Sequence, residues 1–184
     1  KEIPEYLTRF AASFNSASPI TISNVVKAIA TYERSLVTNH SAFDQFKRGD
    51  LEALNEMEKL GLETFKRVGC NKCHNGPMLS DYETHVLGVP HNKKLSEFDL
   101  GFKDTEAFRT ATLRNLRFTA PYMHNGTFKT IREVLEFYED IALKKQSSIS
   151  VDYKKLDKEA RSLTIKTRDF TPLEAFLDTL NGEF

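Results

Sequence analysis

The sequence predicts an all-α protein. In several segments, apolar residues recur at intervals of three and four, the spacing that places them on one face of a helix. Two of these segments begin with a Thr followed three residues later by a Glu, a pattern typical of helix N-termini. No run of alternating apolar and polar residues indicates a half-buried strand. We therefore expect helices joined by irregular loops.

Length and charge exclude several classes of protein. The chain has 184 residues, which suits one domain or slightly more. Its 26 basic and 26 acidic side chains cancel, so no overall field favours nucleic acid or an anionic membrane surface. No segment approaches the roughly 18 apolar residues of a membrane span. Because residues 1–4 lack the features of a signal peptide, we expect a mature or cut chain.

The first predicted helix begins near Ser23 and carries one apolar stripe that needs a partner surface. The stripe consists of Val25, Ile29, Tyr32 and Leu36. The segment 38–50 that follows is rich in Asn, Ser, Asp and Gly, which is typical of a loop. We therefore divide the chain into a helical segment, 1–50, and a domain, 51–184.

A second helix is predicted over 51–68, ending at Gly69 directly before two cysteines. Its inward-facing residues are expected to be Leu54, Met57, Leu60 and Phe65. From 75 to 110 the helical periodicity disappears, and Gly or Pro interrupts the sequence repeatedly. A loop of this length in a compact domain usually wraps a ligand or has a function of its own.

Two predicted helices follow this loop. Thr130 and Glu133 are expected to form a capping box. Thr171 and Glu174 are expected to form another, with Pro172 at the first helical position. The inward faces of the two helices comprise Ile131, Val134, Leu135, Tyr138 and Ala142, and then Leu173, Phe176, Leu177 and Leu180.

The cysteines provide the clearest chemical signal. Cys70 and Cys73 lie in the pentapeptide Cys-Asn-Lys-Cys-His, the pattern of covalent heme c attachment. Two intervening residues let both sulfurs reach one edge of the porphyrin, and His74 would bind the iron while its other ring nitrogen donates to a backbone carbonyl. A structural zinc would need further ligands, and a thioredoxin-like pair would need a βαβ setting. The histidines available to a zinc are His85, His91 and His124.

The residues alone leave the sixth iron ligand open. The candidates are Met78, Met123, Tyr138, the remaining histidines or an open site. Met78 follows His74 so closely that we expect it on the same side of the ring. Met123 precedes a helix, as in small cytochromes with His and Met ligands. Tyr138 lies on the apolar face of that helix, where a core tyrosine is the alternative. The choice matters because the axial ligand sets the heme potential.

Several segments resemble the bacterial di-heme cytochrome c peroxidase and MauG family. They are GLETFKRVGCNKCHNG at 61–76, FRTATLRN at 108–115 and TAPYMHNG at 119–126, with VVKAIATYER at 25–34 further upstream. The resemblance implies a cytochrome c-like fold and an oxidoreductase of two domains, each with one heme c. The N-terminal heme would be peroxidatic, and the C-terminal heme would pass electrons to it or store oxidising equivalents. This chain resembles the C-terminal half and the segment before it.

The resemblance also implies residue roles. Where classical peroxidases of the family have a Met ligand on the helix after the loop, MauG-like members have a Tyr, and the matching residue here is Tyr138. We therefore favour Tyr138 as the sixth ligand, with Met123 second. The backbone carbonyls of Thr119 and Pro121 match part of a calcium site between the two domains, and oxygen-only ligation suits that ion.

Three further residues are candidates to contact the heme. His124 matches a loop histidine of the family that lies beside the heme, although such a residue is often a surface or capping residue. Arg109 and Arg114 are candidates to pair with the propionates, and surface salt bridges are the alternative. No catalytic residue is assigned within this chain.

The leading functional hypothesis is peroxide-linked electron transfer. A small donor protein would supply electrons, which pass to a peroxidatic heme in an N-terminal domain or companion chain, where hydrogen peroxide is reduced. The rival hypotheses are MauG-like oxidation of a protein substrate and a mono-heme electron carrier without catalytic activity. We also consider a homodimer. Covalent heme attachment implies an exported, oxidising compartment, which is the periplasm in bacteria.

Overall fold

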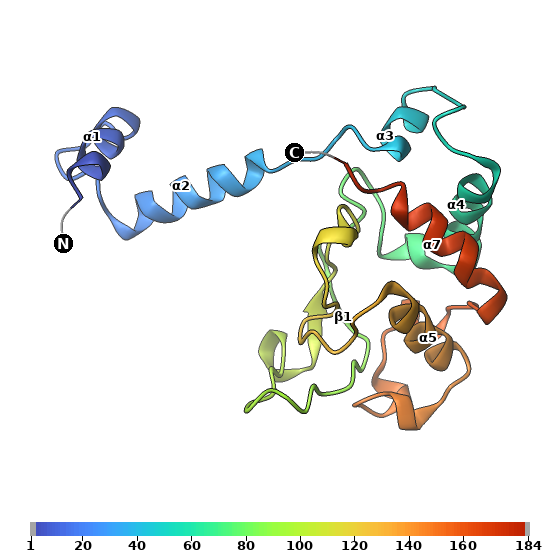
Figure 1. The fold of residues 1–184 in the computed structure, drawn as a ribbon. Coiled ribbons are helices and arrows are strands. Elements are labelled where there is room, and N and C mark those ends of the chain that lie inside the picture. Colours follow the sequence, from blue (N-terminus) through green and yellow to red (C-terminus); the bar gives the residue numbers. More distant parts are fainter. Residues whose placement is uncertain (1–2, 183–184) are drawn as a thin grey trace. The chain divides into compact units, whose positions relative to one another are not determined.

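The computed structural model describes residues 3–182, which form two compact units, 3–37 and 38–182. The first unit contains α1 (Pro4–Ser13) and α2 (Ile22–Ser35) (Figure 1). The predicted loop 38–50 groups with the second unit, and it contains a helix of its own, α3 (Ala42–Lys47). The outermost ends of the two predicted segments, 1–2 and 183–184, lie outside the described residues.

Helix α2 forms where the sequence predicts it. Thr21 caps its start, with the side-chain oxygen accepting a hydrogen bond of 3.1 Å from the Asn24 amide. The apolar stripe remains largely in solvent, since Ile29, Tyr32 and Leu36 are 53%, 65% and 46% exposed. Within its own unit, residues 3–37, the stripe therefore has no partner surface.

The second unit is mainly helical. Besides α3, its helices are α4 (Glu56–Val68), α5 (Ile131–Ala142), α6 (Lys158–Arg161) and α7 (Phe170–Asp178). Its strands are β1 (Thr84–Val86) and β2 (Ala107–Arg109), which pair antiparallel with His85 opposite Phe108. The all-α class is confirmed apart from this small sheet, whose three-residue strands are too short to show an alternating pattern. No helix in the described part of the chain is both long enough and apolar enough to cross a bilayer.

Helices α4 and α7 form the centre of the core. The rings of Phe65 on α4 and Phe176 on α7 lie with centroids 5.1 Å apart. The helices approach this closely because Gly61 has no side chain. A Cβ atom at Gly61 would lie 2.0 Å from the carbonyl oxygen of Pro172 and 2.6 Å from the Cβ of Phe176. The contact therefore fixes α4, which leads directly to the cysteines.

The inward face predicted for α4 is only partly correct. Leu54 and Phe65 are buried, but Met57 and Leu60 are exposed. The helix begins at Glu56, so Leu54 lies before it, and the buried face is made by other residues. These are Gly61, Thr64, Phe65 and Val68.

The predicted capping of α5 is confirmed. The Thr130 hydroxyl accepts from the Glu133 amide at 3.2 Å, and the Glu133 carboxylate accepts from the Thr130 amide at 3.1 Å. Tyr138 is therefore placed two turns into a well-defined helix. The predicted end of α4 is also confirmed, because Gly69 follows Val68 with a left-handed φ of 101°.

The capping box predicted for the last helix is wrong. Helix α7 begins at Phe170, with Asp169 rather than Thr171 at its N-cap. Glu174 instead forms an ion pair with Arg132 of α5. Asp169 accepts hydrogen bonds from Arg67 of α4 at 2.7 Å and from the Lys166 amide at 2.9 Å. Ion pairs with neighbouring helices therefore override the local pattern.

Candidate heme site

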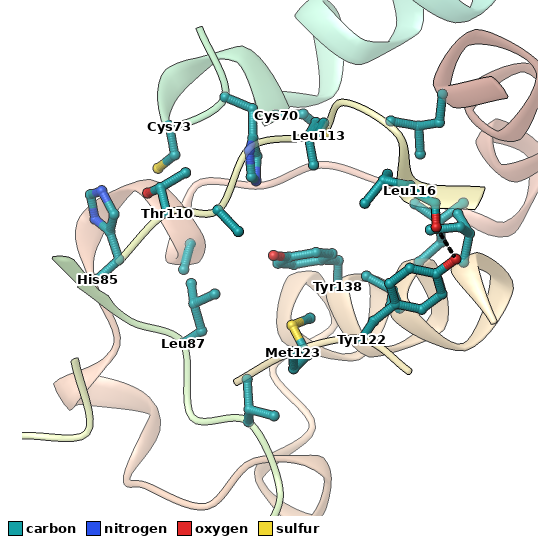
Figure 2. Close-up of a pocket in the computed structure, with 18 of the residues that line it drawn as sticks. Cys70, Cys73, His85, Leu87, Thr110, Leu113, Leu116, Tyr122, Met123 and Tyr138 are labelled. Atoms are coloured by element: carbon teal, nitrogen blue, oxygen red, sulfur yellow. Dashed lines mark hydrogen bonds between the residues drawn. The ribbon is translucent and has the colours of Figure 1, made fainter. Parts of the chain in front are cut away.

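The second unit encloses a cavity of about 480 Å³ between the cysteine turn, the loop before α5, and α5 itself. Figure 2 shows Cys70 and Cys73 on one side of this space, with Tyr138 and Met123 on the opposite side. Most of the lining side chains are apolar. The volume falls within the range of roughly 300–1,000 Å³ that is usual for cofactor sites. The cavity therefore has the size and the mainly apolar lining that suit a large cofactor.

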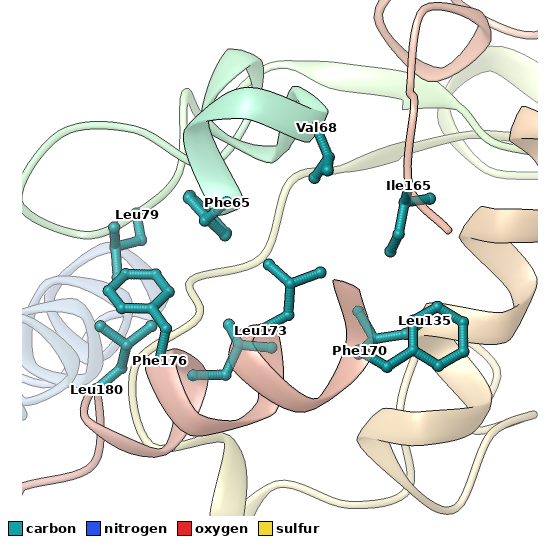
Figure 3. Packing of buried hydrophobic residues seen from close by; sticks show 10 residues of the cluster. Phe65, Val68, Leu79, Leu135, Ile165, Phe170, Leu173, Phe176 and Leu180 are labelled. Carbon is teal, nitrogen blue, oxygen red and sulfur yellow. The ribbon is translucent and has the colours of Figure 1, made fainter. Parts of the chain in front are cut away.

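A tight turn places the attachment residues on one wall. After Gly69 the chain forms a single 3-10 turn over Cys70–Lys72, and the His74 amide donates to the Cys70 carbonyl at 3.0 Å. Cys70, Cys73 and His74 all line the cavity as a result. Figure 3 shows the core behind this wall, where Phe65 and Val68 of α4 face Leu173 and Phe176 of α7.

His74 is held in the form that binds a metal. Its Nδ1 lies 3.1 Å from the Leu79 carbonyl oxygen. Because a carbonyl can only accept, Nδ1 carries the proton, as the sequence predicts for a histidine ligand. Burial lowers the pKa of His74 against the opposing effect of this hydrogen bond, so the ring is neutral at neutral pH. Nε2 therefore has a lone pair to offer to iron.

The cysteines do not resemble a redox pair or a zinc site. Burial raises the pKa of the Cys70 thiol to about 12 and that of the Cys73 thiol to about 11. A reactive, redox-active cysteine has a lowered pKa instead. In the described part of the chain, Cys73 lies with Asp81 and His85 at metal-binding spacing, but Cys70 is not in that group. Thioether attachment uses both sulfurs without a thiolate ligand, so these residues fit heme c.

Two candidates for the sixth ligand line the cavity. Tyr138 reaches it from α5, and Met123 reaches it from the loop before α5. Burial raises the pKa of the Tyr138 phenol above its ordinary range. Met78 does not line the cavity. The preference for Tyr138 over Met123 stays a prediction.

The two arginines have different surroundings. Arg114 is buried, and its guanidinium donates to both oxygens of Asp44 at 2.8 and 2.9 Å and to the carbonyls of Thr38 and Pro77. Burial alone would raise the pKa of Asp44, but hydrogen bonds from Arg114 and Ser41 lower it to about 2. This geometry gives Arg114 a structural role.

Arg109 has a more open position. It lines the cavity, and its guanidinium lies over the Tyr82 ring, 5.0 Å from the centroid. Unlike Arg114, it has no carboxylate partner among the described residues. Arg109 and Arg114 both line the cavity, so the propionate role of each stays a prediction.

The loop before α5 contributes the other predicted residues. His124 lines the cavity and stacks on Phe108, with ring centroids 3.5 Å apart, and burial lowers its pKa. Thr119 and Pro121 also line the cavity. The calcium role of their carbonyls stays a prediction.

Sequence reasoning missed one polar cluster on the cavity wall. His85, considered only as a ligand to zinc or to the heme iron, lies between the carboxylates of Asp81 and Asp157. Asp157 is 72 residues away along the chain, so no local pattern could have indicated the contact.

Comparison with known proteins identifies related chains. A family model described as "Di-haem cytochrome c peroxidase" matches residues 1–52. Cytochrome-c peroxidase IdrP1 of Pseudomonas sp. strain SCT is 35% identical over 173 residues, covering 74% of this chain and 45% of that protein. Methylamine utilization protein MauG of Methylorubrum extorquens is 32% identical over 188 residues, covering 100% of this chain and 51% of that protein. The chain thus spans about half the length of the curated relatives it matches.

Solved structures agree with these relatives. A crystal structure of a MauG-like protein associated with microbial copper homeostasis matches with a TM-score of 0.74 and 25% identity, over 97% of this chain and 59% of that one. The diheme peroxidase BthA from Burkholderia thailandensis has the same fold, with a TM-score of 0.67 and 20% identity over 95% of this chain and 55% of its own. The family implies heme c, for which the cavity has the required residues. The chain therefore belongs to the di-heme cytochrome c peroxidase and MauG family of oxidoreductases.

Proposed function

We propose that this chain is the electron-relaying half of a di-heme oxidoreductase. It receives electrons one at a time from a small donor protein and passes them to a peroxidatic heme outside this chain, where hydrogen peroxide is reduced to water. The observation that carries the proposal is the cavity, because it places Cys70, Cys73 and His74 on one wall and Tyr138 opposite. Both axial positions are then filled, which suits electron transfer better than the binding of a small substrate.

The chain's own residues attach and orient the cofactor. Cys70 and Cys73 would form the thioether links, and His74 would supply its Nε2 to the iron while the Leu79 carbonyl holds its ring. Tyr138 would hold the iron through its phenolate oxygen, with Met123 as the alternative ligand. When bound, heme c supplies one-electron chemistry at its iron. The apolar walls exclude water and confine charge changes to the iron and the few polar groups beside it.

A MauG-like role is the second candidate, and Tyr138 is the observation that favours it. An anionic phenolate stabilises ferric over ferrous iron, so it lowers the potential relative to a Met ligand and makes higher oxidation states easier to reach. The MauG of Methylorubrum extorquens matches along the whole of this chain. In this case the chain would store oxidising equivalents for use on a protein substrate.

The proposal also includes partners and location. The exposed stripe of α2 would pack on the heme domain that carries the peroxidatic site, with calcium held near Thr119 and Pro121 between the two halves. Thioether formation needs reduced cysteines delivered to an exported compartment, so we place the protein in the bacterial periplasm.

Assays with peroxide test whether this chain relays electrons without reducing peroxide itself. The heme-loaded chain should take up one electron in a coulometric titration, yet show little peroxidase turnover. His74 and Tyr138 would fill both iron positions, and we assign no peroxidatic acid or base among the described residues. The measurement is the oxidation rate of a reduced donor cytochrome after peroxide is added, with free heme as the reference. Turnover at rates typical of enzymes, roughly 1–1,000 per second, would contradict the relay role.

A ligand test distinguishes Tyr138 from Met123. We expect Tyr138→Phe to remove the sixth ligand, open the site, and convert the ferric spectrum from six-coordinate to five-coordinate or water-bound. Met123→Leu keeps a side chain of similar volume and should leave the spectrum nearly unchanged. The measurements are ferric absorption and electron paramagnetic resonance spectra, which report the ligands directly. The opposite pattern, with the ligand lost only in Met123→Leu, would establish His and Met ligation.

A further inference from the structure

A histidine with two carboxylate partners lies on the cavity wall. Nδ1 of His85 is 2.8 Å from Oδ2 of Asp157, and Nε2 is 2.9 Å from Oδ2 of Asp81. The His85 side chain is only 14% exposed. Figure 2 shows His85 beside Cys73, at the edge of the cavity where the second sulfur lies. The histidine is therefore next to a point of heme attachment without being an iron ligand.

The two contacts determine the protonation state of the ring. A neutral imidazole has one N–H group, whereas an imidazolium has two. Each ionised carboxylate can only accept a hydrogen bond. Both short contacts can be hydrogen bonds to ionised carboxylates only if His85 carries two protons. The geometry therefore fits a protonated His85. When the ring loses one proton, one of the two carboxylates no longer has a hydrogen-bond donor.

Backbone hydrogen bonds anchor the main chain at both aspartates. The Asp81 amide donates to the Cys73 carbonyl at 2.8 Å, which ties Asp81 to the cysteine turn. The Asp157 amide donates to the Val86 carbonyl at 3.0 Å, which ties Asp157 to β1. The Asp81 carboxylate is also held directly, because its Oδ1 accepts a hydrogen bond of 3.0 Å from the Glu83 amide. The proton site is thus preorganised.

We infer that His85, held between Asp81 and Asp157, is a proton-binding site coupled to the one-electron reduction of the heme attached at Cys73. This inference rests on the proposed function. The electron comes from the donor protein and reduces ferric to ferrous iron, while one proton from water binds the neutral His85 ring. Reduction adds one negative charge to the cavity, and the proton compensates it nearby, where the apolar walls screen charge poorly.

The surroundings of His85 set the pH range of this coupling. Burial alone would lower the pKa of His85, but hydrogen bonds to Asp81 and Asp157 and their charges raise it above its ordinary value near 6.5. The Glu159 carboxylate lies within 4.8 Å of the His85 and Asp157 ligand atoms, and the Cys73 sulfur lies within 4.8 Å of those of Asp81 and His85. From β2, Phe108 lies opposite His85, and Arg109 lies opposite the neighbouring Thr84.

The sign of the effect follows from the raised pKa. Below the pKa in the ferric state, His85 is protonated in both oxidation states, and the potential does not depend on pH. Between the ferric pKa and the higher ferrous pKa, each reduction takes up a proton, so the potential falls as pH rises. We therefore expect the dependence above about pH 6.5.

The test is the midpoint potential of the heme bound at Cys70 and Cys73, measured in the heme-loaded protein from about pH 5 to pH 9. The wild-type potential should fall within this range, at a slope of at most about 59 mV per pH unit, the limit for one proton per electron. His85→Gln should abolish the slope. In Asp157→Asn, the pH range over which the potential falls should shift to lower pH, because one carboxylate no longer stabilises the protonated ring. The control is His40→Gln, an exposed histidine that does not line the cavity, and it should retain the wild-type slope.

A nuclear magnetic resonance titration measures the pKa of the His85 ring directly. It uses the wild-type protein, so it does not require that a variant folds. The His85 pKa should be higher in the reduced protein than in the oxidised protein. Equal pKa values in the two states, or an unchanged slope in a folded His85→Gln variant, would overturn the inference. A heme-loaded wild type with a flat potential would overturn this inference alone. A denatured chain with the mass of the bare polypeptide would overturn the proposed function as well.

Discussion

Replacing both Cys70 and Cys73 by Ala is expected to abolish covalent heme retention. The two thioether bonds survive denaturation, whereas a heme held only by His74 and the apolar walls is extracted by acid and organic solvent. The measurement is the mass of the denatured chain, purified from a host that matures c-type cytochromes. The wild type should carry the mass of one heme, and the double variant should have the mass of the polypeptide alone.

A control variant lies in the same turn. Asn71 is exposed between the two cysteines, so Asn71→Ala should keep the full heme mass. Loss of heme in this variant would mean that the turn itself, rather than its sulfurs, limits attachment. A wild-type chain with the bare polypeptide mass would contradict the heme assignment outright.

Of the substitutions proposed for this chain, Gly61→Ala is expected to lower the free energy of unfolding the most. The new Cβ would lie 2.0 Å from a backbone oxygen of Pro172, and a backbone atom cannot turn away as a flexible side chain can. Helices α4 and α7 must therefore separate, which opens the centre of the core. Overpacking costs about 1–3 kcal/mol when side chains can adjust, and we expect at least about 3 kcal/mol here. Total stabilities are about 5–15 kcal/mol, so the loss is large.

Urea unfolding followed by circular dichroism measures this effect on the heme-loaded protein. The matched control is Glu63→Ala, an exposed position on the same helix, which should change the free energy of unfolding by less than about 0.5 kcal/mol. If Gly61→Ala unfolds at the same urea concentration as Glu63→Ala, then α4 and α7 do not pack as closely as described.

The sequence predicted the features that depend on local patterns. The box at Thr130 and Glu133, the turn at Gly69 and the helical class all follow from neighbouring residues, and the structure confirms them. The presence of Cys70, Cys73, His74 and Tyr138 around one cavity was also expected, although the family resemblance contributed to the choice of Tyr138.

Features that depend on distant residues could not be predicted. Glu174, expected to cap α7, instead pairs with Arg132 of α5. Arg114 binds Asp44, 70 residues earlier in the chain, which nothing in its own segment indicates. The same holds for the contact between His85 and Asp157. Each of these charged groups found its partner only when the chain folded, whereas caps and turns are determined within a few residues.

The packing of α4 against α7 also has a consequence for the order of folding. Arg67 and Asp169 are joined across 102 residues of chain, and contacts of such separation form slowly because the loop entropy is lost before they form. Until α7 docks, Phe65 and Val68 are not packed against its apolar residues, and the helix that leads to the cysteine turn is not held in place. We therefore expect the two walls of the cavity to meet late, when the C-terminal helix docks, so that a nascent chain presents its cysteines before it has a pocket.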